Sequence, residues 1–241
     1  MSPPTGRPTG ALVGPLLAAM IALACGGSHE PRPAAPTGPA LSELMHGHLR
    51  TIRAIYRALL VDDLASTKAR AGELARIPDR TGSKEWDDAA RFARAEADRL
   101  ARAGSPDQAR ELSTGLATFC ADCHMFRARP EVFRTRAIPP DDGSVAAAMT
   151  RHEWAADTLW LGVIAPSTDL WREGLAEMAS VTRLAGRGER AAEVAVLAAR
   201  LDALAKGSSE LRGQNERAGR LAEIMDVCAA CHAITRRAGG R

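Results

Sequence analysis

Two five-residue stretches, Cys120–His124 and Cys228–His232, each place two thiols three residues apart and a histidine directly after the second thiol. Cys-x-x-Cys-His is the attachment signature of c-type haem. Two thiols on one side of a helical turn can add to the two vinyl groups of a porphyrin, and the histidine can then bind the iron. The residues expected to hold the cofactor, two covalently attached haem c groups, are Cys120, Cys123, His124, Cys228, Cys231 and His232.

The cysteine count supports this interpretation over its alternatives. The chain has five cysteines, and the two motifs use all of them except Cys25. A zinc site built from two Cys-x-x-Cys pairs would leave about a hundred residues between them, far more than usual zinc spacings, and would not require either histidine. A thioredoxin-like dithiol or a disulfide pair would need a βαβ context, and the sequence has no such pattern.

The first residues of the chain indicate export. Arg7 precedes an apolar run, Ala11–Ala24, that is too short to anchor a protein in a bilayer, so residues 1–24 are interpreted as a signal peptide. The segment Ala22–Gly26 resembles the lipobox of bacterial lipoproteins, in which the cysteine, here Cys25, becomes the lipidated amino terminus. The resemblance implies a periplasm-facing lipoprotein of the bacterial cell envelope, while an ordinary cleaved signal with a chance cysteine is the alternative.

The hydrophobic pattern after the export signal is helical throughout, which predicts an all-α protein. Residues before Leu41 are rich in Gly, Pro and Ala and predict a flexible tether. The expected organisation is a signal peptide over 1–24, a lipidated tether over 25–40, a first bundle over 41–128, a linker over 129–144 and a second bundle over 145–237.

Four helices are expected in each half, so that the fold is two tandem four-helix bundles with a haem motif at the end of each last helix. In the first half, Asp62 or Asp63 should cap the second helix and Ser83 the third. The helices expected there are 42–61, 64–77, 83–104 and one from 105 into the first motif. Those of the second half are 145–164, 168–184, 188–205 and one from about 211 into the second motif. Three tryptophans of the second half are expected either around its haem or in its core: Trp154, Trp160 and Trp171.

An internal repeat relates the two halves. Met45 and His48 recur as Met149 and His152, 104 residues later, and the haem motifs recur after 108 residues. The motifs, their place at the end of a fourth helix and the helix count resemble the cytochrome c′ and cytochrome c556 class over about residues 41–236. This resemblance implies that His124 and His232 are proximal iron ligands, and that the other side of each haem faces a residue of the first helix.

The sixth ligand of each iron is sought on those first helices. Met45 and His48 are three residues apart and share a helical face, as do Met149 and His152. Outside the motifs, His48 and His152 are the histidines at matching positions of the repeat, and histidine is unusual on an apolar face unless it has a partner. We therefore favour His48 and His152, with Met45 and Met149 as alternative ligands. If all four were only packing residues, the irons would be five-coordinate.

The charge pattern argues against nucleic acid as a partner. The net charge is only +3, and the arginines are spread along helices beside acidic residues, as on solvated faces. The expected function is electron transfer between redox partner proteins rather than enzymatic catalysis. The alternative is a haem protein with an open iron site that binds a small gas ligand or acts as a peroxidase. Members of the class often dimerise, which leaves a homodimer open, although tandem bundles could pack against each other instead.

Overall fold

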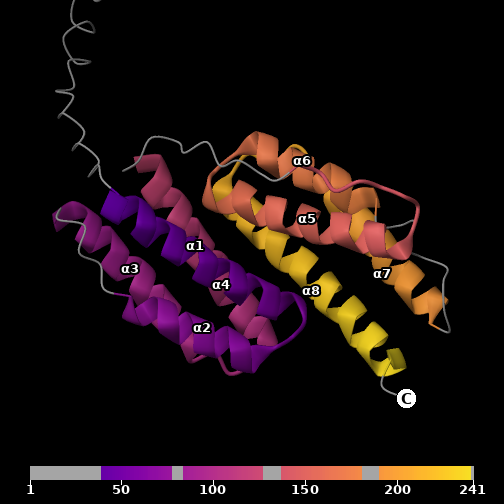
Figure 1. Ribbon diagram of the computed structural model, residues 1–241, viewed down its shortest axis with the longest axis horizontal. Helices are drawn as coiled ribbons and strands as arrows, with labels where there is room; N and C mark the ends of the chain where they lie inside the picture. Colours follow the sequence, from indigo (N-terminus) through magenta and orange to yellow (C-terminus); the bar gives the residue numbers. More distant parts are fainter. Residues whose placement is uncertain (1–38, 78–83, 127–136, 181–189, 240–241) are drawn as a thin grey trace, which may run out of the picture. The chain divides into compact units, whose positions relative to one another are not determined.

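The computed structural model of the chain describes residues 39–77, 84–126, 137–180 and 190–239. Within these ranges all regular structure is helical and there is no strand (Figure 1), which confirms the all-α prediction. The α-helices are α1 (Pro39–Leu60), α2 (Leu64–Arg76), α3 (Lys84–Ala101), α4 (Pro106–Phe126), α5 (Val145–Ile164), α6 (Thr168–Met178), α7 (Ala191–Lys206) and α8 (Gln214–Gly239).

Polar side chains cap the starts of α2, α4, α5 and α6; at α4 the Ser105 hydroxyl accepts from the Gln108 amide at 3.2 Å. The Asp63 carboxylate accepts a hydrogen bond from the Ser66 amide of α2 at 2.9 Å, so Asp63 is the cap and not Asp62. Ser144 accepts from the Ala147 amide at the start of α5, and the Ser167 hydroxyl does the same for α6. These caps satisfy amides that have no partner within the helix. Ser83 lies outside the described residues.

The two motifs lie on α4 and α8. The first motif lies near Phe126, the last described residue of α4. The second motif lies inside α8, which continues from His232 to Gly239, so the expectation that this motif ends its helix is wrong. The segment after His232 contains no proline or glycine before Gly239, and nothing in it interrupts the backbone hydrogen bonds.

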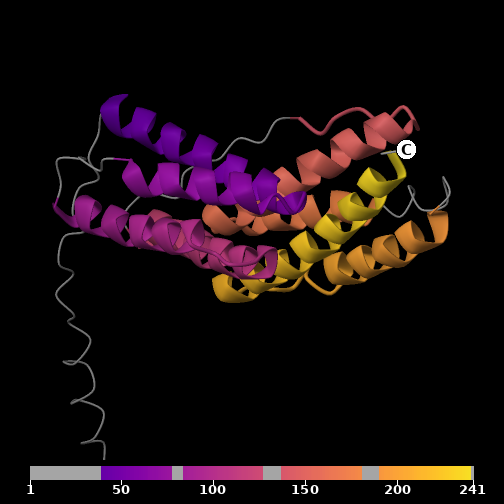
Figure 2. The same ribbon diagram turned by 90° about the horizontal axis from the view of Figure 1, so that it is seen from below.

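Each half of the chain brings its first helix into contact with its last. In the first half α1 packs on α2, α2 on α3, α3 on α4, and α4 returns to α1. In the second half α5 packs on α6, α6 on α7, α7 on α8, and α8 returns to α5. Figures 1 and 2 show α8 running beside both α7 and α4. The halves therefore also contact each other, through α4 and α8, α1 and α8, and α4 and α5.

A buried aromatic pair joins the two halves. Tyr56 of α1 stacks on Trp160 of α5, with ring centroids 4.8 Å apart and an interplanar angle of 16°, and both residues are fully buried. The Tyr56 hydroxyl donates to the Ala156 carbonyl at 3.1 Å. Tyr56 and Trp160 are 104 residues apart, the same spacing as Met45 and Met149. Equivalent positions of the repeat thus meet, as they do across a two-fold interface, and buried residues of both halves form one core.

Two glycines allow α5 and α6 to approach closely. A Cβ atom on Gly162 would lie 2.7 Å from the backbone nitrogen of Trp171, and one on Gly174 would lie 2.9 Å from that of Leu159. The helices therefore meet backbone to backbone at these two positions, and no larger residue fits without displacing one of them.

Candidate functional site

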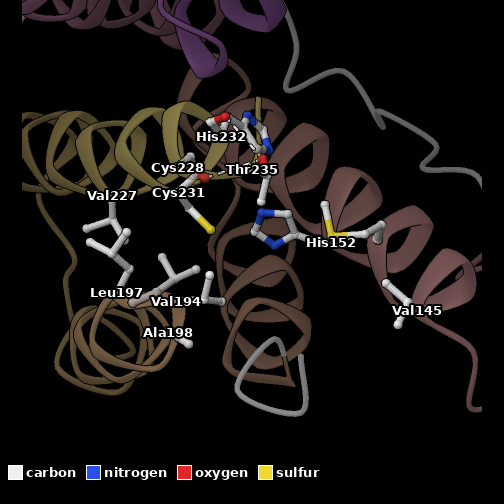
Figure 3. A pocket seen from close by; sticks show the side chains of 12 residues that line it. Val145, His152, Val194, Leu197, Ala198, Val227, Cys228, Cys231, His232 and Thr235 are labelled. Carbon is white, nitrogen blue, oxygen red and sulfur yellow. Dashed lines mark hydrogen bonds between the residues drawn. The ribbon is translucent and has the colours of Figure 1, made fainter. Parts of the chain in front are cut away.

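The second haem motif lines a pocket between α5, α7 and α8. The pocket has a cavity volume of ≈ 200 Å³. Cys228, Cys231 and His232 line it from α8, and His152 faces them from α5 (Figure 3). The remaining wall is largely aliphatic, with Val145, Val194, Leu197, Ala198, Leu201 and Val227. An apolar cavity with a few converging polar groups is the usual form of a cofactor site.

A single hydrogen bond selects the tautomer of His232. Its Nδ1 atom lies 2.8 Å from the carbonyl oxygen of Leu60, the last residue of α1. A carbonyl oxygen can only accept, so Nδ1 must carry the proton and donate it. The lone pair of the neutral ring then lies on Nε2, which is the nitrogen left to bind a metal. In metal-ligating histidines, the ring nitrogen that does not bind the metal typically donates such a hydrogen bond.

His152 is a buried polar side chain with an unused ring nitrogen. The residue is 9% exposed, and its Nδ1 atom has no hydrogen-bond partner among the described residues. Burial, with a smaller contribution from His232 nearby, lowers the pKa of His152 to about 4. The ring is therefore neutral near pH 7 and has a lone pair to offer. A buried polar atom without a partner is costly unless a ligand satisfies it.

The structure distinguishes the two candidate sixth ligands of the second half. His152 and Met149 both line the pocket, but Met149 is 38% exposed. A methionine thioether loses no stability when it has no hydrogen-bond partner, whereas a buried imidazole nitrogen without one destabilises the fold. The geometry of this site therefore favours His152 over Met149.

The first motif lies on α4, and its counterpart residues lie on α1, which packs against α4. Cys120, Cys123 and His124 are half-buried, as are Met45 and His48. Cys120 packs against the shared core. In the second half His152 is buried and Met149 is exposed, but in the first half His48 and Met45 are both half-buried. Both therefore stay candidates for the sixth ligand of the expected first haem.

The four motif cysteines are free thiols in the structure. Burial, followed by the neighbouring cysteine of each motif, raises the pKa of Cys120 and of Cys228 to about 12. Burial also raises the pKa of Cys231. These thiols are protonated near pH 7 and pack as small apolar groups.

The donor set fits a haem better than a bare metal ion. Among the described residues, no group of three or more His, Cys, Asp or Glu side chains could hold an ion. A structural zinc site needs four such ligands. A haem iron needs only one or two from the protein, because the porphyrin nitrogens supply the rest, and two histidines beside two thiols meet that need.

Sequence patterns did not reveal Leu60, whose carbonyl contacts His232, or Arg110, which binds Asp62 of the turn that follows Leu60. Arg110 of α4 is buried, whereas the arginines as a group were expected on solvated faces; its acidic partners come from three segments of the chain. Its local sequence, an arginine three residues after Asp107, is the same as that of a solvated arginine and gave no signal of burial. Leu60 takes part through its carbonyl, which any residue has, so no sequence signal could have found it.

The tryptophans of the second half belong to the core and not to the pocket wall. Trp154, Trp160 and Trp171 are all buried, and the Trp171 indole donates to the Ser208 carbonyl at 3.0 Å. None of the three lines the pocket beside the second motif.

The chain matches no protein-family model, no curated protein and no solved structure. The cytochrome resemblance therefore stays a prediction. The predicted signal peptide and Cys25 lie outside the described residues, as does nearly all of the predicted tether. Along the described part of the chain, none of the helices has both the length and the apolar character needed to cross a membrane.

Proposed function

We propose that the chain is a dihaem c-type cytochrome that transfers electrons in the bacterial cell envelope and is tethered to a membrane through lipid on Cys25. The observation that carries the proposal is the second pocket. Two thiols, the Nε2 side of His232 and the buried His152, whose Nδ1 has no partner among the described residues, share this one apolar cavity. Within this proposal, residues 41–128 and 145–237 each form one four-helix bundle. The contact of first with last helix in each half supports that division.

The residues have separate roles in this function. Cys228 and Cys231 would attach the second haem, and His232 and His152 would bind its iron. By the repeat, Cys120, Cys123 and His124 would do the same for the first haem, with His48 or Met45 as sixth ligand. Haem supplies a one-electron change at its iron.

The protein contributes orientation and exclusion of water. The Leu60 carbonyl holds the His232 ring in one tautomer and direction. The aliphatic side chains of α7 would shield the haem from water, and burial of this kind is one of the means by which a protein sets a haem potential. Both features suit a carrier of single electrons between redox partner proteins.

The visible spectrum of the ferrous full-length protein, before and after carbon monoxide, tests the proposal. The protein is made in a host that matures c-type haem, and its mass gives the number of covalent haems. We expect two haems and a low-spin spectrum that carbon monoxide leaves unchanged. Cys120→Ser/Cys123→Ser and Cys228→Ser/Cys231→Ser should each retain one haem.

The other outcomes are equally informative. A carbonyl spectrum would move the gas-binding or peroxidase alternative ahead, because it requires an open iron position. A protein without covalent haem would overturn the proposal. For the membrane tether, Cys25→Ser should release the protein from the membrane fraction, and retention would contradict lipidation at that cysteine.

A further inference from the structure

The histidine of the second haem motif is held by the first half of the chain. His232 donates to the Leu60 carbonyl across a sequence separation of 172 residues. One turn further along α8, the Arg236 guanidinium donates to the next carbonyl, that of Val61. Two consecutive carbonyls at the end of α1, those of Leu60 and Val61, therefore accept from two consecutive turns of α8.

The end of α1 explains why these carbonyls are available. The last carbonyls of a helix have no partner within it and carry the negative end of the helix dipole. Leu60 is the last residue of α1, and Asp62 follows in a left-handed conformation with φ of 58°. The chain reverses there and begins α2 at Leu64. Both carbonyls thus remain for donors from α8, and Arg236 adds a favourable positive charge.

Arg110 connects this turn to α8. Its side chain, 8% exposed, binds Asp62 at 2.7 Å and also contacts Asp226 of α8 and Asp107 of its own helix. Asp226 precedes His232 by less than two turns. One buried guanidinium from α4 thus holds both the turn that accepts from His232 and the helix that carries His232. Arginine suits this role because its five donors form a rigid fork.

We propose that the turn Leu60–Asp62 of the first half, held by Arg110, is a structural part of the second haem site and positions His232. This inference rests on the proposed function. A hydrogen bond from Nδ1–H to a carbonyl makes the imidazole a stronger ligand and fixes its orientation. The reduction potential of the second haem should therefore depend on Arg110, which is a positioning residue, while that of the first haem should not.

The test compares Arg110→Gln with the unchanged full-length protein. In the ferrous protein, NMR of ¹⁵N-labelled histidine should show a His232 ring N–H protected from solvent exchange and close to Val61 protons. Arg110→Gln should speed that exchange by about tenfold, because the Leu60 carbonyl is then held less firmly; changes around a metal-ligating histidine alter metal affinity by a similar factor. It should also raise the potential of the second haem alone, with haems assigned through Cys228→Ser/Cys231→Ser. Arg110→Lys should restore the protection in part.

Arg99→Gln is the matched control, because Arg99 forms an exposed ion pair with Glu96 on α3 and should leave exchange and both potentials unchanged. If Arg110→Gln fails to mature, Asp226→Asn removes one contact and keeps the other two. Unchanged exchange and potentials, or equal shifts in both haems, would overturn the inference. An unprotected His232 ring beside covalent haem overturns this inference alone, whereas the absence of covalent haem overturns the proposed function as well.

Discussion

At the residue scale, the second site depends on two ring nitrogens with opposite environments. Nδ1 of His232 has a carbonyl partner, and Nδ1 of His152 has no partner among the described residues. The first condition selects the tautomer that can bind a metal through Nε2. The missing partner of His152 Nδ1 costs free energy, because a buried polar atom is left without a hydrogen bond, and a bound ligand would remove that cost.

For the dihaem cytochrome proposed above, His152→Ala should open the sixth position of one iron. We expect the ferrous protein to bind carbon monoxide at one of its two haems, because the buried imidazole is no longer there to close that site. Met149→Leu is the matched control, since it changes a half-exposed side chain of the same pocket and should leave the low-spin spectrum intact. If Met149→Leu opened the site and His152→Ala did not, the ligand assignment would be reversed.

At the element scale, capping and close approach decide where helices lie. Asp63 caps α2, and hydrogen bonds from the Ser66 amide and hydroxyl, followed by the Ala65 amide, lower the pKa of its carboxyl below the ordinary value of 3.8. The charged form is therefore the one that the folded state prefers. Gly162 and Gly174 are the second determinant, because they let α5 and α6 meet at backbone distance.

Asp63→Asn should change how stability depends on pH. The lowered pKa means that the stabilising contribution of Asp63 is fully present above its unfolded value and is lost as the pH falls through the folded value. Asparagine also caps helices but does not titrate. Melting temperatures measured from about pH 5 to pH 3 should therefore converge for the two proteins as the pH falls. Parallel curves would show that the Asp63 charge contributes nothing to folding.

Gly162→Ala should destabilise the fold by about 1–3 kcal/mol, the usual cost of overpacking, because the added methyl group meets the Trp171 backbone. Gly219→Ala is the control on α8, where nothing lies within 4 Å of the new atom. That change should stabilise by about 0.5–1 kcal/mol through helix propensity. Denaturant unfolding measures both, and equal effects would contradict the close approach of α5 and α6.

At the scale of the whole molecule, the halves are joined by contacts that neither could form alone. Tyr56 and Trp160 bury a stacked pair between α1 and α5, and Arg110 bridges carboxylates of both halves. A shared core of this kind predicts that residues 39–239 unfold in one cooperative step.

Trp160→Ala should lower the free energy of unfolding by about 3–5 kcal/mol and keep a single transition. The substitution also removes the ring against which Tyr56 of the other half packs. The unfolding transitions followed by haem absorbance, in the proposed holoprotein, and by helical circular dichroism should therefore both move to lower denaturant concentration, and by the same amount. Val196→Ala, at a residue 70% exposed, should change stability by less than about 0.5 kcal/mol. Two separate transitions, with only the second half weakened, would show that the bundles fold independently.

The sequence by itself determined the local features of this protein. The haem motifs are contiguous, and helix periods and caps act within a few residues, so the expected helix 145–164 coincides with α5 and Asp63 caps α2 as one of two candidates. Helix ends were less predictable: α6 ends at Met178 rather than near residue 184, and α8 runs past its motif to Gly239. Nothing in the local sequence of α8 required it to end at the haem motif.

Only the tertiary structure decided which side chains the second site brings together. The burial of His152 over Met149, the carbonyl of Leu60 on His232 and the burial of Arg110 all follow from contacts between helices distant in sequence. A backbone carbonyl carries no residue signature, and an arginine beside an aspartate has the same local pattern whether buried or solvated. These features exist because α1 and α4 pack against α8, and that packing depends on the combined surfaces of helices from both halves.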